Sequence, residues 1–183
     1  MLILRGSPAL SPFRLAKLLS RVQQTVPAVD HLYAEFVHFV DLEEKLDAGQ
    51  RSVLDRILAY GPALPGEEPE GRSLVVTPRA GTISAWSTKA SDIARNCGLS
   101  HVRRIERGVV YYLKPDDRAL DDDALARVAA LLYDRMTESV FYRLEEAEGL
   151  FLTTEPRPLQ TVDILTGGSD ALAKANRDWG LAL

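Results

Sequence analysis

The chain has 183 residues, of which 46% are hydrophobic and 26% charged, and its formal net charge is −4 at pH 7. This composition excludes a disordered or collagen-like chain, and no apolar run reaches the roughly 20 residues of a membrane-spanning helix. The acidic balance does not favour nucleic-acid binding, which uses a basic face. A single cysteine excludes an internal disulfide, and the short apolar start is unlike a secretory signal, so we expect a cytoplasmic protein without a nucleic-acid or membrane partner.

The first part of the chain alternates strand and helix patterns. Residues 1–6 are typical of a short strand, and Ser11 followed by Pro12 predicts the start of a helix. Residues 31–43 alternate along a long strand. Asp47 is placed to cap a second helix, which we expect to end at Gly61 and Pro62.

The same order of patterns then returns. A strand over residues 73–78 precedes a helix that begins near Ser84 and stops at Gly98. The spacing predicts a buried face on this helix, made of Trp86, Ala90, Ile93, Ala94 and Cys97. Residues 102–113 predict another long strand, and Asp121 is placed to cap a fourth helix whose apolar face extends through Met136 to Val140.

The two parts match as repeats of one unit. An offset of about 72 positions takes Ile3 to Val75, Pro12 to Ser84 and Tyr33 to Ile105, so that like elements coincide. We therefore expect an α+β fold over residues 1–145: a duplicated strand-helix-strand-helix unit whose halves share one helix-covered sheet around a pseudo-twofold axis. Residues 146–183 form a linker and begin a small helical domain, with a helix capped by Ser169 and ended by Gly180.

Motifs for catalysis are absent from the sequence. It has no nucleophile motif, phosphate loop, dinucleotide fingerprint or metal-ligand cluster, so we predict no catalytic, cofactor-binding or metal-binding residue in it. The three histidines have no ligand-spaced partner and are interpreted as packing or surface residues. Cys97 is expected to be a buried, inert thiol, and the aspartates at 116–123 to favour a helix start.

The candidate functional stretch is the segment from Arg79 to Arg107. It carries six cations against two anions in a chain that is acidic overall. At its start, hydroxyls, cations and the N–H groups of a helix terminus come together, and such a terminus can hold a phosphate or an acidic surface. The candidate interdomain or anion contact consists of Arg79, Thr82, Ser84, Trp86, Ser87, Thr88 and Lys89. The alternative stays open that these residues only cap the helix, with Trp86 in the core and Lys89 in solvent.

The chain resembles a known family along its whole length. The residues that carry the resemblance are ILRGSPALSPFR, LYAEFVHFVDL, RILAYGPAL, TPRAGTISAWSTKASDIARNCGL, RIERGVVYYL, LYDRMTESVF and ALAKANRDWGLAL, in this order. They are similar to the N-terminal part of the large, single-chain phosphoribosylformylglycinamidine synthase (FGAM synthase). The helix that begins near Ser84 departs from the family in two ways. Ala85 stands where proline is expected, and Thr88 and Ser91 exchange the usual serine and threonine.

The resemblance implies a role within a larger enzyme. FGAM synthases use glutamine and ATP to convert formylglycinamide ribonucleotide (FGAR) to its amidine in purine biosynthesis, and their N-terminal domain is similar to a fused pair of small PurS subunits. The resemblance places ATP, magnesium and the glutaminase machinery in other domains, so this fragment alone is expected to be inactive. Two hypotheses follow: a scaffold domain that docks the synthase and glutaminase domains of its own parent chain, or a stand-alone module that binds a phosphorylated metabolite at residues 79–89.

Overall fold

The computed structural model describes residues 1–62, 69–116, 120–152 and 158–182. Its centre is a five-stranded antiparallel sheet with the strand order β1-β2-β4-β3-β5. The strands are β1 (Leu2–Pro8), β2 (Val29–Leu42), β3 (Arg72–Pro78), β4 (Val102–Pro115) and β5 (Glu138–Phe141). The helices are α1 (Pro12–Thr25), α2 (Ala48–Leu58), α3 (Ala85–Asn96), α4 (Asp122–Leu132), the 3-10 helix η1 (Leu144–Phe151) and α5 (Ile164–Trp179).

The expected α+β class is confirmed, and the architecture is consistent with a duplicated unit. β1 and β3 each have 7 residues, β2 and β4 each have 14, and α2 and α4 each have 11. One offset links the helix caps Ser11 and Ser84 and the strand starts Val29 and Val102. The same offset links Phe36 to Val109, and these two residues are directly paired in the sheet. The pseudo-twofold axis therefore passes between the two central strands at this pair.

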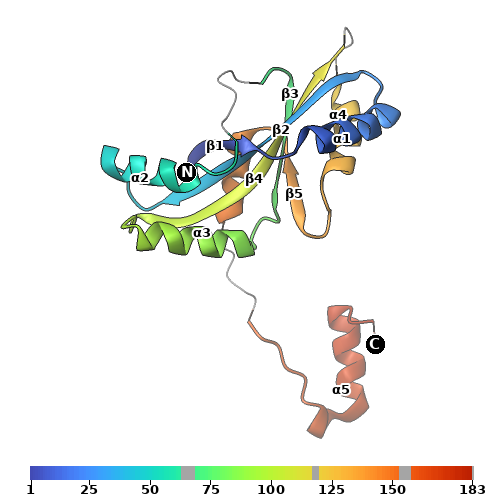
Figure 1. Cartoon of the computed structure of the whole chain (residues 1–183). Helices are drawn as coiled ribbons and strands as arrows, with labels where there is room; N and C mark the ends of the chain where they lie inside the picture. The colour runs from blue at the N-terminus through green and yellow to red at the C-terminus, as the bar shows by residue number, and fades with distance from the viewer. Residues whose placement is uncertain (63–68, 117–119, 153–157, 183) are drawn as a thin grey trace. The chain divides into compact units, whose positions relative to one another are not determined.

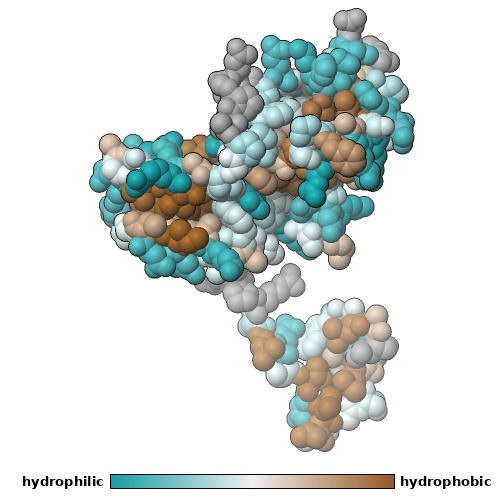
Figure 2. Space-filling model, in the orientation of Figure 1, coloured by the Kyte–Doolittle hydropathy of each residue, from teal (hydrophilic) through white to brown (hydrophobic). Residues whose placement is uncertain are grey.

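Two pairs of helices cover one face of the sheet. α1 and α4 lie together at one end, and α2 and α3 lie at the other (Figure 1). Ala34 of β2 packs in the core under α1 and α4, whereas Val40 packs in the core under α2 and α3. These two residues share a face because side chains alternate along a strand. We call them the α1/α4 core and the α2/α3 core, and Figure 2 shows apolar side chains gathered between α2 and α3.

The opposite face of the sheet has its own, smaller core. Val37 and Phe39 of β2 pack there with Ala147 and Leu150 of η1. The sequence did not predict η1 or the edge strand β5. The fourth helix was expected to continue to Val140, but α4 ends at Leu132, and Val140 pairs with Val76 across β5 and β3. The prediction was wrong because a turn at 134–138 separates the helix from a strand whose four residues are too few for a clear period.

The chain divides into two compact units, Met1–Thr153 and Thr154–Leu183. The predicted boundary at residue 145 therefore falls inside the first unit, because Ala147 and Leu150 are buried in its core. The second unit contains α5, which Asp163 caps and which ends at Gly180 in the left-handed conformation (φ 64°) that was expected there. The helix begins earlier than the sequence predicted, and Gly168 (φ 54°) interrupts it.

Candidate functional site

The candidate stretch follows β3 and leads into α3, and its hydroxyls are used within the chain. Ser84 is the N-cap of α3, where its Oγ accepts the backbone N–H of Ser87 at 3.0 Å. Thr82 donates its hydroxyl to the carbonyl of Arg79 at 2.6 Å, and Thr88 donates to the carbonyl of Ser84 at 3.4 Å. These bonds shape the loop and the first turn of the helix.

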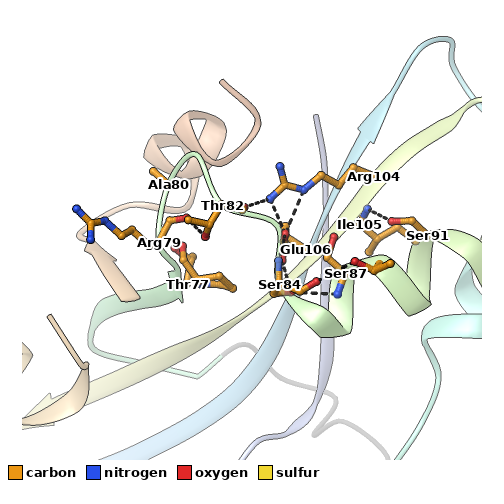
Figure 3. Close-up of polar contacts among 12 residues, drawn as sticks. Thr77, Arg79, Ala80, Thr82, Ser84, Ser87, Ser91, Arg104, Ile105 and Glu106 are labelled. Carbon is orange, nitrogen blue, oxygen red and sulfur yellow. Dashed lines mark hydrogen bonds and ion pairs between the residues drawn. The ribbon is translucent and has the colours of Figure 1, made fainter. Parts of the chain in front are cut away.

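A buried carboxylate fixes the start of α3 to the sheet. Glu106 of β4 is fully buried, and its two oxygens accept the backbone N–H of Ser84 at 3.2 Å and the Ser84 hydroxyl at 2.8 Å. Arg104 forms an ion pair with Glu106 and also donates to the Thr82 carbonyl (Figure 3). A negative charge is favourable at a helix N-terminus, so Glu106 already satisfies much of the positive potential there. This arrangement disfavours a second anion at the same place.

The buried face of α3 differs from the expected one. Ala90 and Ala94 are buried as predicted, but Ile93 is 50% exposed and Cys97 is exposed. The stripe that packs on the sheet consists of Ser87, Ala90, Ser91 and Ala94. Two serines were overlooked because the sequence argument counted only apolar residues. Their small side chains let the helix lie close to β4, where Ser91 Oγ accepts the backbone N–H of Ile105 at 3.0 Å.

The seven predicted site residues therefore separate into two groups. Ser84, Trp86 and Ser87 face inward: Ser87 is fully buried, and Trp86 is only partly buried, stacking on His38 with ring centres 5.6 Å apart. Arg79, Thr82, Thr88 and Lys89 are exposed, and the Arg79 guanidinium donates to the carbonyl of Met136 at 3.5 Å. The structure does not bring the seven together as one surface.

Residues of the first half that sequence reasoning missed complete the neighbourhood of Trp86. His38 of β2 is fully buried, and its Nε2 lies 2.6 Å from Tyr60 Oη. Gly6 makes room for it, since a Cβ there would lie 2.6 Å from His38 Cε1. Burial and the nearby Arg107 guanidinium lower the pKa of His38 to about 4, so the imidazole is neutral at pH 7. In the sequence, only the repeat could have indicated that residues of β2 lie near Trp86, because it predicts that the long strands of the two halves share one sheet.

The described residues hold no group of three or more His, Cys, Asp or Glu that could bind a metal ion. Within the same residues, no helix is both long enough and apolar enough to cross a membrane.

Fold and site together define a class of protein. It is a domain with two fused copies of one strand-helix-strand-helix unit, in which the start of α3 is tied to the sheet through the buried Glu106. The model of the formylglycinamide ribonucleotide amidotransferase N-terminal family matches residues 35–151. The chain belongs to this family. It is therefore part of an FGAM synthase, an enzyme of purine biosynthesis, as the resemblance predicted.

Proposed function

We propose that this domain is a non-catalytic scaffold that docks the synthase and glutaminase domains of its own parent chain. In this proposal the parent is an ATP-dependent ligase that makes FGAM from FGAR and glutamine in the cytoplasm. Its ATP, magnesium and glutamine sites lie in the other domains.

One observation supports a docking role most directly: large apolar side chains are exposed just before α3 and on it. Ile83 is 66% exposed and Ile93 is 50% exposed, and the same segment carries the exposed cations Arg79 and Lys89. The two hydrogen bonds from Ser84 to Glu106, which we call the Glu106 clamp, fix the residue next to Ile83. Exposed apolar side chains flanked by charges are typical of protein interfaces.

The position of Glu106 speaks against the alternative, a module that binds a phosphorylated metabolite at residues 79–89. The carboxylate of Glu106 lies at the helix start where such a phosphate would bind. Like charges in that position repel each other, so the docking role is the better-supported proposal.

Mutagenesis of the full-length gene product tests the docking role. We expect Lys89→Ala and Arg79→Ala to lower glutamine-dependent synthase turnover, or to release glutamate without matching product formation. The matched control is Lys17→Ala, which removes an exposed lysine from α1, the repeat counterpart of α3. Turnover and coupling like those of the control in both variants would contradict the proposal.

The isolated 183-residue chain tests the second part of the proposal, that the domain is not catalytic. We expect it to release no glutamate from glutamine above a protein-free control. Hydrolysis that persists through repeated purification would contradict this expectation.

A further inference from the structure

A cluster of aromatic rings surrounds one arginine between the two helix pairs. The guanidinium carbon of Arg107 lies 4.3 Å from the ring centre of Phe36, 4.8 Å from that of Trp86 and 6.0 Å from that of Tyr60. Arg107 belongs to β4 and Phe36 to β2, so the cluster lies on the central strands beside the pseudo-twofold axis. We call Phe36, Tyr60, Trp86 and Arg107 the arginine cage.

The charge of the cage has no counter-ion among the described residues. Arg107 is partly buried, and within the described residues its guanidinium makes one hydrogen bond, to Tyr60 Oη at 3.4 Å. His38 beneath it is neutral at pH 7. A guanidinium that loses water without gaining a carboxylate costs free energy, and stacking on aromatic rings offsets only part of that cost. Stacking also leaves the N–H edge of the guanidinium free to bind an anion in bidentate fashion.

The fold does not require this cage. The repeat counterpart of Arg107 is Ala34, which is fully buried, and the counterpart of Trp86 is Phe13, which is 77% exposed. The α1/α4 end is therefore built from the same elements without a cation at the matching position. Packing alone does not explain why the other end has one.

The space beside Arg107 fits a protein segment better than a phosphate group. A cleft of about 350 Å³ lies against it, with Phe36, Val76, Val109 and Tyr111 among its walls. Arg107 is the one cation that lines this cleft, whereas phosphate sites usually combine several donors. Its one acidic residue, Glu138, already accepts the backbone N–H of Asp134 at 2.7 Å. An arginine and a tyrosine, Arg107 and Tyr111, line this cleft, and both residue types are enriched in interface hot spots.

We propose that Arg107 receives the carboxylate of an aspartate or glutamate from another domain of the parent chain, with apolar neighbours of that residue entering the cleft. The proposal rests on the docking role proposed above and names a second, different surface for it. Two N–H groups of the guanidinium would donate to the two carboxylate oxygens, while Phe36 and Trp86 hold its plane.

Photo-crosslinking in the full-length gene product tests this contact. A benzoylphenylalanine is introduced at Thr137, an exposed residue that lines the cleft, and in a second variant at Lys89 beside the start of α3. We expect the probe at Thr137 to crosslink outside residues 1–183, within a few positions of an aspartate or glutamate. Crosslinks confined to residues 1–183 would overturn the proposal. If the Lys89 probe still reaches other domains, the docking role survives; if neither probe does, both proposals fail.

A charge exchange then tests the residue itself. Arg107→Glu, and replacement of the mapped carboxylate by arginine, should each lower glutamine-dependent turnover about tenfold, and the double variant should recover most of the loss. Arg107→Gln, which keeps a hydrogen-bonding amide without the charge, should show the same loss while unfolding cooperatively. Arg103→Glu is the matched control, because Arg103 is an exposed β4 arginine paired with Asp41. A double variant no better than the single ones, or an Arg107→Gln variant with full turnover, would overturn the assignment.

Discussion

The two ends of the helix-covered face are built from matching elements but filled differently. Under α1 and α4 the core is apolar apart from the hydroxyl of Tyr111, with Val22, Leu125 and Val128 fully buried. Near α2 and α3 the same face also buries His38, and it places Arg107 among aromatic rings. Because an apolar core suffices at one end, the polar groups at the other end exceed what this fold needs. Such a local excess is where function is expected.

The largest loss of stability should come from shortening side chains in the two apolar cores. Leu125→Ala in α4 and Leu54→Ala in α2 each remove a fully buried side chain, and each should lower the free energy of unfolding by roughly 2–5 kcal/mol. Urea denaturation measures both values. Leu125 lies in the larger core, so its variant should lose more; a larger loss at Leu54 would mean that the α2/α3 end carries more of the stability than its packing indicates.

The next largest effect should be a pH dependence of the free energy of unfolding, which arises from His38 at the α2/α3 end. The pKa of His38 is about 4 in the folded chain against an ordinary value of 6.5, so folding favours the neutral ring. The neutral ring contributes fully to the free energy of unfolding above pH 6.5. This contribution, about 3 kcal/mol, is lost as the pH falls from 6.5 through 4. Tyr111, the counterpart of His38, has a pKa raised by burial and does not titrate in this range.

Urea denaturation at pH 7 and pH 4.5 checks this, with His38→Asn as the reference. The natural chain should lose more stability on acidification than the variant does. Equal losses in the two proteins would show that His38 becomes protonated in the folded state without penalty.

A smaller effect should distinguish the two helix caps. Ser84→Ala removes the cap of α3 and also a donor to buried Glu106, so we expect a loss of about 2 kcal/mol. Ser11→Ala removes the exposed counterpart, whose hydrogen bond to the Arg14 N–H is 3.4 Å long, and should cost about 0.5 kcal/mol. Thermal unfolding of both variants provides the comparison. Equal costs would argue that the Glu106 clamp adds nothing to the cap.

The smallest effect should be that of the exposed lysines. Lys89→Ala and Lys17→Ala should both leave the free energy of unfolding of the isolated chain within about 0.5 kcal/mol of the natural value. A loss of turnover in the full-length Lys89 variant would then reflect docking and not folding. A clear destabilisation by Lys89→Ala alone would remove that interpretation.

Strong periodicity and capping residues made much of the fold predictable. Ser11, Asp47, Ser84 and Asp121 cap the four helices as expected, because a short polar side chain before an apolar period is a local signal. β5 and η1 were missed because both are short and their burial depends on a sheet formed by distant residues.

The candidate site was only partly predictable for the same reason. Ser84 was placed correctly at a helix start, yet its partner Glu106 lies in another element and looked like an ordinary strand charge. Phe36, His38 and Tyr60 come from the other half of the chain, and nothing in their local pattern links them to Trp86 or Arg107. Contacts of this kind are set by strand register, which local propensity does not encode.

The pair Phe36 and Val109 on the pseudo-twofold axis has a consequence for how the two halves could diverge. In an association of two identical subunits, every residue near the axis appears twice, so an arginine at one position would bring a second guanidinium toward the same axis. Like charges held that close repel each other. Covalent fusion keeps both halves at high effective concentration while letting each position differ, so Arg107 can face a half that carries Ala34. One chain can thus hold a single polar centre that a symmetric dimer would have to duplicate.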